Sequence, residues 1–274
     1  MAEARRQPEI GSFLRRWRED RHVTQLEVAL DAEVSARHLS FVETGRSRPG
    51  REMLLRILER LGVPFRERNR LLLDAGYAPA YPERALDDPD LAPVRDALDV
   101  VLSGHEPYPA VAVDRVWNMV AANSAMVALT AGIEIAPELL EPPINVIRIG
   151  LHPGGMAPLF LNIGDWHGHW VRRLEHQAAA TKDERLTALL DEIASYPVPG
   201  PAVDPASGIT AEQMLGPVRM RTPDRGELNF FGMFASFDTP FEVTTSELAI
   251  EVLFPADRMT AEKLHQGATD APRR

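Results

Sequence analysis

The first 75 residues contain five short amphipathic segments, each bounded by residues that start or stop helices. Apolar residues at helical spacing predict a first helix over residues 10–20. Thr24, with Glu27 three residues later, forms a capping box that starts a second helix, and Ser35 caps a third that ends at Gly45. A fourth and a fifth helix are expected over 51–61 and from Pro64 onward. Helices this short bury apolar surface only against one another, so an all-α bundle is predicted.

The second and third of these helices are joined by a tight turn, which is the helix-turn-helix arrangement. The residues resemble the lambda-repressor-like (Xre) family. The likeness rests on residues 24–29, on Val34-Ser35 and on 39–49, which contain a Glu-x-Gly-x-x-x-Pro pattern. The resemblance implies a DNA-binding domain whose third helix lies in the major groove of double-stranded DNA.

This geometry selects candidate DNA contacts. Arg37 is placed to make a bidentate contact with guanine, and Gln25 opens the second helix, where a phosphate is expected. Arg46 and Arg48 follow the recognition helix and are predicted to bind phosphates. Leu26, by contrast, is assigned to the core together with Leu30. The predicted DNA-contacting residues are Gln25, Ser35, Ala36, Arg37, His38, Ser40, Arg46 and Arg48.

The charge of the chain is unevenly distributed. The net charge is −10, but residues 1–80 carry +3 and residues 81–274 carry −13. Such asymmetry favours a nucleic-acid-binding segment attached to an acidic body. A proline-containing stretch over 77–82 predicts an elbow between a domain at 1–80 and a second domain at 81–274. The chain has no cysteine, which excludes disulfides, thiolate metal sites and cysteine nucleophiles.

The second region combines strand and helix patterns. A hairpin is predicted over 109–123, and Thr181 with Glu184 is interpreted as a capping box that opens a helix. Three strands are expected over 215–221, 227–237 and 247–254. The order predicts an α+β fold, with an antiparallel sheet of about five strands and helices on one face.

This order resembles a PAS-like sensor fold, and with the preceding helix-turn-helix the chain resembles the MmyB-like family of bacterial regulators. The likeness rests on Arg115-Val116-Trp117-Asn118, on Asn145 and Arg148, and on residues 161–166. The resemblance implies a pocket between sheet and helices that suits a fatty acid or a similar apolar small molecule.

Aromatic and apolar residues of this region supply candidate pocket contacts. Arg148 lies in an apolar run, where a charge needs a partner, and a ligand carboxylate, Asp165 or solvent beside a strand would serve. His167 and His169 are two residues apart on a predicted helix and therefore face apart, which disfavours a metal site. The predicted ligand-binding residues are Trp117, Met119, Arg148, Phe160, Trp166, Phe230 and Phe234.

Together these features predict a cytoplasmic, homodimeric, ligand-responsive transcription regulator. No signal peptide or membrane span is recognised. No phosphate-binding loop, dinucleotide motif, nucleophile elbow or zinc-protease motif is present, so neither enzymatic activity nor a cofactor or metal is expected. Two alternatives stay open: a second domain that serves only dimerisation or protein contact, and an enzyme of another type regulated through its helix-turn-helix.

Overall fold

The protein is described from a computed structural model, which covers residues 3–181, 183–198, 218–238 and 240–269. The chain forms two compact units. The first comprises Met1–Ala85 with Thr239–Ser246, and the second comprises Leu86–Asp238 with Glu247–Arg274. Each unit has its own hydrophobic core.

The first unit is built from five helices whose boundaries follow the sequence closely. They are α1 (Glu3–Asp20), α2 (Gln25–Asp31), α3 (Ala36–Glu43), α4 (Arg51–Arg60) and α5 (Phe65–Asp74). Thr24 and Glu27 form the expected capping box on α2, and the Ser35 hydroxyl accepts a hydrogen bond from the backbone of α3. Gly45 takes the left-handed conformation, with φ of 72°, that ends α3. The all-α bundle is thereby confirmed, although α1 begins earlier than predicted.

The core of this unit excludes two residues that the sequence placed in it. Leu26 and Leu30 are 60% and 68% exposed, whereas α2 buries Val28 and Ala29. The assignment of Leu26 and Leu30 was wrong because α2, with seven residues, presents only one narrow stripe to the bundle. Helix α1 approaches α3 so closely at Gly11 that a Cβ there would lie 2.4 Å from the Val42 carbonyl oxygen.

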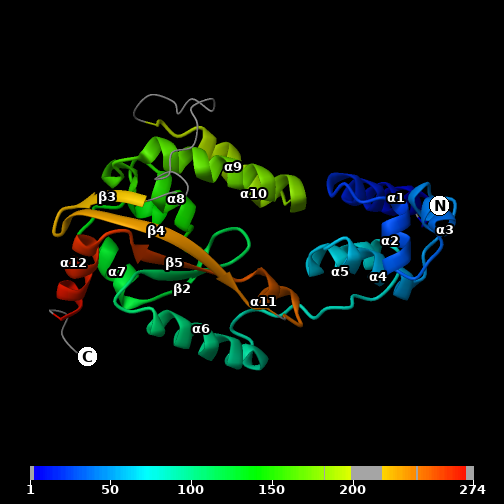
Figure 1. Cartoon of the computed structure of the whole chain (residues 1–274), viewed down its shortest axis with the longest axis horizontal. Coiled ribbons are helices and arrows are strands. Elements are labelled where there is room, and N and C mark those ends of the chain that lie inside the picture. Colours follow the sequence, from blue (N-terminus) through cyan, green and yellow to red (C-terminus); the bar gives the residue numbers. More distant parts are fainter. Residues whose placement is uncertain (1–2, 182, 199–217, 239, 270–274) are drawn as a thin grey trace. The chain divides into compact units, whose positions relative to one another are not determined.

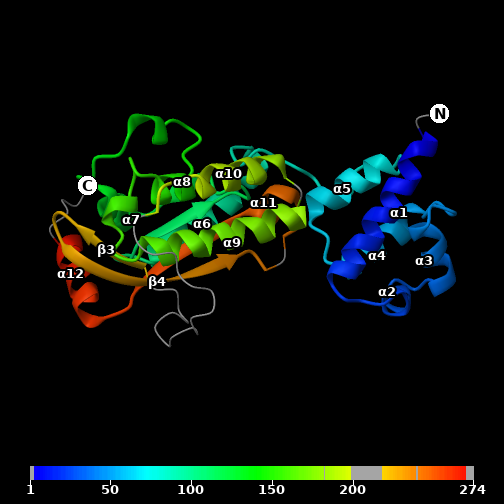
Figure 2. The ribbon, with the colours of Figure 1, turned by 90° about the horizontal axis from the view of Figure 1, so that it is seen from above.

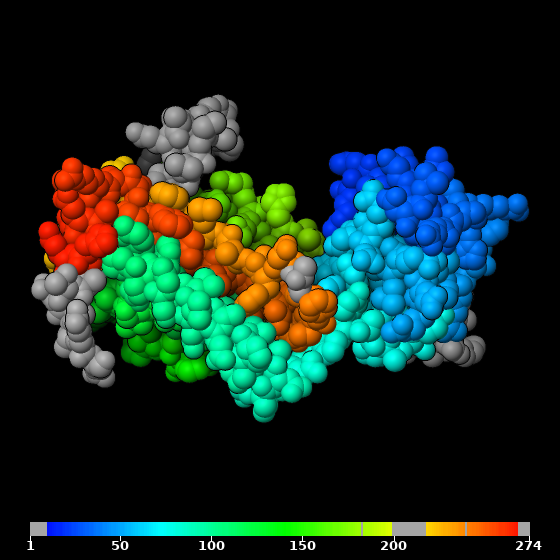
Figure 3. Space-filling model, turned by 60° about the horizontal axis from the view of Figure 1, so that its bottom comes forward, coloured from blue at the N-terminus to red at the C-terminus, as the bar shows by residue number. Residues whose placement is uncertain are grey.

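A segment from the far end of the chain completes the first unit. The backbone N–H of Val243, in α11 (Val243–Glu247), donates to the Pro82 carbonyl at 2.9 Å. The Thr244 hydroxyl donates to the Arg84 carbonyl at 2.6 Å. In Figure 3 this orange segment lies against the chain that follows α5. The stretch after α5 is therefore fixed by residues that connect two strands of the second unit.

The second unit contains a five-stranded antiparallel sheet in the order β2-β1-β5-β4-β3 (Figure 1). The strands are β1 (Ala110–Val113), β2 (Met119–Ala122), β3 (Val218–Thr222), β4 (Gly226–Ser236) and β5 (Ala249–Pro255). The last strand, β5, pairs with β1 and β4 and occupies the centre. This confirms the predicted α+β fold. The start of the strand expected over 215–221 falls outside the described residues.

Helices cover both faces of this sheet. Figures 1 and 2 show α9 and α10 over one face, and α6 lies on the opposite side in Figure 1. Helix α6 buries Leu98 and Leu102 against Ala110, Ala112 and Ile250, so it is an addition to the predicted single layer. The helices of the unit are α6 (Ala92–Gly104), α7 (Ser124–Thr130), α8 (Val146–Leu151), α9 (Ile163–Thr181), α10 (Glu184–Ala194) and α12 (Arg258–Thr269). Short 3₁₀ turns lie at Pro89–Leu91, Pro137–Leu139 and Ala157–Leu159.

Two local interpretations of the sequence were wrong. The run around Arg148 is helix α8 rather than a strand, because the Asn145 side chain caps it by accepting from the Arg148 N–H at 3.1 Å. Helix α10 is capped by Asp183, and Thr181 is the last residue of α9. None of the helices in the described ranges has the length and apolar character needed to span a bilayer.

Candidate functional site

The start of α3 presents a polar surface on the first unit. Ser35, Arg37, His38 and Arg46 are exposed, and Ser40 is half-buried beside the half-buried Ala36. The Arg37 guanidinium lies 5.4 Å from the centroid of the Phe41 ring. This contact orients a cationic fork at the position where a recognition helix meets base edges.

Glu43, at the end of α3, organises the helix-turn-helix from the inside. Its carboxylate is buried and accepts from Arg18 Nε at 2.8 Å and from a second Arg18 nitrogen at 3.0 Å. The Gln25 amide donates to the same carboxylate at 2.8 Å. These contacts raise the pKa of Arg18, chiefly through the hydrogen bonds from its guanidinium. The Gln25 side chain, predicted to meet a phosphate, is thus engaged within the protein.

Arg48 and Arg46 have different surroundings. The Arg48 guanidinium donates to the Ala75 carbonyl and lies 5.5 Å from the Tyr77 ring centroid. The Tyr77 hydroxyl in turn donates to the Pro49 carbonyl at 3.0 Å. Both arginines are exposed, but Arg48 ties the loop after α3 to the end of α5 through these contacts.

The second unit contains a cavity of about 450 Å³, partly open to solvent, between the sheet and helices α7, α8 and α9. This volume lies within the range of sites that hold small molecules. The lining is almost wholly apolar. Lining residues include Val111, Met119, Ala122, Met126, Ile147, Gly150, Phe160, Trp166, Trp170, Met220, Glu251 and Leu253.

The predicted ligand-binding residues divide into two groups. Met119, Phe160 and Trp166 line the cavity. Trp117, Phe230 and Phe234 instead pack in the core, and the Trp117 indole donates to the Gln177 amide oxygen at 2.8 Å. The aromatic residues therefore divide between cavity wall and core, a division that the sequence pattern did not reveal.

Arg148 does not line the cavity. Its guanidinium makes two hydrogen bonds to the Glu192 carboxylate, at 2.7 and 2.6 Å. The Tyr196 hydroxyl donates to the same carboxylate. The hydrogen bond from Arg148 is the main reason that the pKa of Glu192 falls below its usual value. The partner that this charge requires is Glu192, which was not among the candidates in the sequence.

Glu251, on β5, is the cavity residue that sequence reasoning missed. Its carboxyl is buried, and burial raises its pKa from 4.5 to about 7, against a smaller opposing effect of Arg173. Within the described ranges no residue hydrogen-bonds to it. The sequence did contain a signal for it. Glu251 is an acidic residue within an apolar strand, on the face opposite to Ile250 and Val252.

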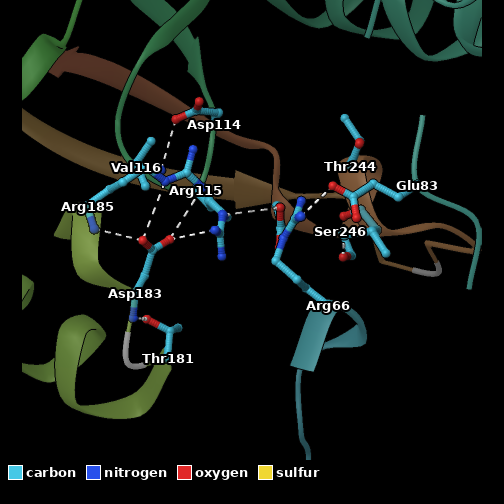
Figure 4. A network of polar contacts seen from close by, with 12 residues as sticks. Arg66, Glu83, Asp114, Arg115, Val116, Thr181, Asp183, Arg185, Thr244 and Ser246 are labelled. Carbon is cyan, nitrogen blue, oxygen red and sulfur yellow. Dashed lines mark hydrogen bonds and ion pairs between the residues drawn. The ribbon is translucent and has the colours of Figure 1, made fainter. Parts of the chain in front are cut away.

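The residues of the Arg115–Asn118 motif build a turn rather than the cavity wall. The Asp114 carboxylate accepts from the N–H groups of Val116 and Asn118 at 2.9 and 2.8 Å. Arg115 reaches Asp183, the cap of α10, at 2.6 Å, and lies 3.7 Å from Glu247 (Figure 4). The motif therefore joins the β1–β2 hairpin to α10 and to the end of α11.

The histidines of α9 have structural partners. His167 Nε2 lies 2.8 Å from the Ile193 carbonyl, and the His169 ring stacks on Trp166 with 5.6 Å between centroids. Within the described ranges no group of three or more His, Asp or Glu side chains is arranged to hold a metal ion.

Comparison with known proteins gives a family match for each of the two units. Residues 9–71 match a helix-turn-helix domain, and residues 94–266 match the MmyB-like transcription regulator ligand binding domain. The clp gene regulator ClgR from Corynebacterium glutamicum is 26% identical over 37% of this chain and 95% of its own, with a TM-score of 0.23. An RNA-binding light-oxygen-voltage receptor is 14% identical over 89% of this chain and 56% of its own, with a TM-score of 0.27. No curated protein matches.

The ligand-binding match covers more than half of the chain and coincides with the unit that contains the cavity. The helix-turn-helix match coincides with helices α1 to α5. The chain therefore belongs to the family of transcription regulators with an MmyB-like ligand binding domain, preceded here by a helix-turn-helix domain.

Proposed function

We propose that this DNA-binding regulator holds a small apolar molecule, such as a fatty acid, in the cavity of its second unit. The proposal rests chiefly on one observation, an apolar cavity of about 450 Å³ inside the matched ligand-binding domain. We propose further that the protein acts in the cytoplasm as a homodimer on double-stranded DNA, because a single helix-turn-helix has a small footprint.

The fold supplies a covalent route between cavity and DNA-binding unit. Strand β5 carries Glu251 at the cavity and directly follows α11. Residues 243 and 244 of α11 hydrogen-bond to Pro82 and Arg84, in the chain that leaves the helical bundle. A ligand shifts operator affinity only if it binds the DNA-competent and DNA-incompetent states unequally. A displacement of β5 on ligand binding would reach the DNA-binding unit through this segment.

The DNA interface has a test that separates base reading from phosphate binding. Replacing Arg37 with alanine should cost about 1–3 kcal/mol at the preferred operator and relax base preference, because a bidentate contact to guanine is lost. Replacing Arg46 with alanine should weaken binding to all sequences alike and reduce the salt slope by about 1. Binding isotherms on operator and random duplexes at several salt concentrations measure both effects.

Glu59→Ala, on α4 outside the proposed interface, serves as the control and should bind like the wild type. The assignment of α3 as the recognition helix fails if the Arg37 and Arg46 variants bind every duplex as the wild type does. Loss of binding together with loss of the helical circular dichroism signal would indicate that the variant is unfolded. An Arg37→Lys variant would then distinguish loss of the contact from loss of the fold.

The cavity has an equally direct test. Gly150 lines it, and a Cβ at this helical position would meet no heavy atom within 4 Å. Replacing Gly150 with leucine should therefore preserve folding, fill cavity space, and weaken binding of dodecanoate about tenfold or more. The measurement is the rise in melting temperature with ligand concentration.

Gly104→Leu is the matched control, because Gly104 ends α6, has no heavy atom within 4 Å of its Cβ position and does not line the cavity. An equal melting-temperature rise in wild type, Gly150→Leu and Gly104→Leu would place fatty-acid binding elsewhere. No rise in any of them would favour a second unit that serves only protein contact.

A further inference from the structure

The cavity wall contains one ionisable side chain among the described residues, that of Glu251. The wall also contains one hydroxyl, that of Thr130, which already donates to the Val127 carbonyl at 3.0 Å. The remaining lining side chains are aliphatic, thioether or aromatic. A ligand in this cavity therefore meets a carboxyl at one position only, that of Glu251, and the other polar side-chain groups of the described wall besides Thr130 are the indole N–H donors of Trp166 and Trp170.

The sheet holds the Glu251 carboxyl at that position. Glu251 lies at the centre of the sheet, opposite Val111 of β1 and Phe234 of β4. Its Oε1 atom lies 3.6 Å from the point that a Cβ at residue 232 would occupy, an ordinary van der Waals distance, so the carboxyl lies over Gly232 of β4. The side chain is 8% exposed, and no described residue hydrogen-bonds to it. A buried polar group without a partner is costly, so a ligand group that pairs with it is favoured.

The charges around Glu251 restrict what that group can be. Arg173 of α9 influences the carboxyl but makes no ion pair with it within 4.0 Å, and its guanidinium lies 4.1 Å from the Phe234 ring centroid. Arg173 does not line the cavity. His169, one turn before Arg173 on α9, has a pKa lowered by burial, by Arg173 and by Arg172, and it does not line the cavity. No cation is therefore present at the described wall to receive a ligand carboxylate.

We infer that the ligand carries an uncharged hydrogen-bonding head group, a hydroxyl or an amide, that pairs with Glu251. This inference rests on the proposed function. A hydroxyl satisfies the carboxyl without adding charge to an apolar cavity. A carboxylate would add a second negative charge beside Glu251. An ammonium group would pair with Glu251 only when the carboxyl is ionised, and it would lose its hydration in an otherwise apolar cavity near the positive charge of Arg173. A fatty acid is accommodated only when Glu251 is protonated.

The pKa of Glu251, raised to about 7, determines how strongly the affinity for a ligand carboxylate depends on pH. At about pH 8 roughly one molecule in ten is protonated, so apparent affinity for a carboxylate falls about tenfold. Val111, Gly232 and Phe234 adjoin Glu251 on the neighbouring strands and do not titrate, and Arg173 of α9 is the charged group of the described residues that acts on it.

The test compares dodecanol, dodecanoate and dodecylamine, which share one chain length, on the full-length protein by calorimetry. At about pH 8 dodecanol should bind about tenfold more tightly than either charged probe, and dodecanoate should gain about tenfold on acidification to about pH 6. Glu251→Gln should raise dodecanoate affinity about tenfold at about pH 8 and change dodecanol affinity little, because the amide also hydrogen-bonds.

Glu262→Gln, at an exposed position of α12, is the matched control and should leave all affinities unchanged. Tightest binding of dodecanoate or dodecylamine at about pH 8 would overturn the inference. Equal binding of all three probes, unchanged by Glu251→Gln, would also overturn the inference. The proposed function would survive that result. Failure of all three probes to bind at either pH would contradict the proposed function itself.

Discussion

Replacing Glu43 with alanine will destabilise the helix-turn-helix unit by about 3 kcal/mol and abolish operator binding at physiological temperature. The Glu43 side chain is only 2% exposed and holds Arg18, which is 12% exposed, through two charged hydrogen bonds. Removing the carboxylate leaves the mostly buried guanidinium with only the exposed Glu19, 3.6 Å away, and frees the Gln25 amide from its acceptor. Breaking a buried pair from one side costs more than the pair contributes, because the remaining charge keeps its desolvation penalty.

Hydrogen exchange of backbone amides within residues 10–75 measures this loss, since the second unit does not contribute to that signal. Glu59→Ala is the control, because Glu59 is exposed on α4 and its removal should change protection little. Equal protection in the Glu43 and Glu59 variants would show that the buried pair does not support the bundle.

Replacing Glu251 with glutamine will stabilise the second unit at about pH 8 by up to about 3 kcal/mol, and the gain will vanish at about pH 4. The pKa of Glu251 is raised in the folded protein to about 7 from 4.5. The folded state therefore binds the proton more tightly than the unfolded state. Stability is lost as the pH rises from about 4.5 to about 7, and the cost is complete above that range. Glutamine does not titrate, so the variant lacks this decline.

Urea denaturation followed by tryptophan fluorescence at several pH values, in a Trp17→Phe background, measures the difference, because the other three tryptophans, Trp117, Trp166 and Trp170, lie in the second unit. Glu262→Gln supplies the baseline for loss of an exposed acid. Parallel stability curves for wild type and Glu251→Gln across this pH range would show that Glu251 is ionised in the folded state without cost.

The two units differ in how far the sequence alone predicts them. The helix-turn-helix follows from caps and breaks, such as Thr24 with Glu27 and Gly45, whose effects operate within four residues along the chain. The same local reasoning placed Leu26 in the core, because helical periodicity identifies an apolar stripe but not how wide a face the bundle covers. Exposure of Arg37 and burial of Leu39 also follow from that periodicity.

In the second unit, the strands and the fold class were predictable from alternation, but the contents of the cavity were not. Arg148 and Glu192 are 44 residues apart, and neither residue's neighbours in sequence indicate the other. The layer formed by helix α6 was not predicted, because the pattern of residues 92–104 does not indicate that this helix covers Ala110 and Ile250.

The sequence by itself determined the helix-turn-helix bundle, the strands and the fold class of the second unit, and the family. Only the tertiary structure decided which aromatic residues line the cavity, that Arg148 pairs with Glu192, and that Glu251 is the acid at the cavity wall. The physical reason is the separation along the chain between the residues that interact. Caps and periodicity depend on residues within a turn of one another, whereas burial of a charge depends on chain segments that meet only when β5 enters the centre of the sheet.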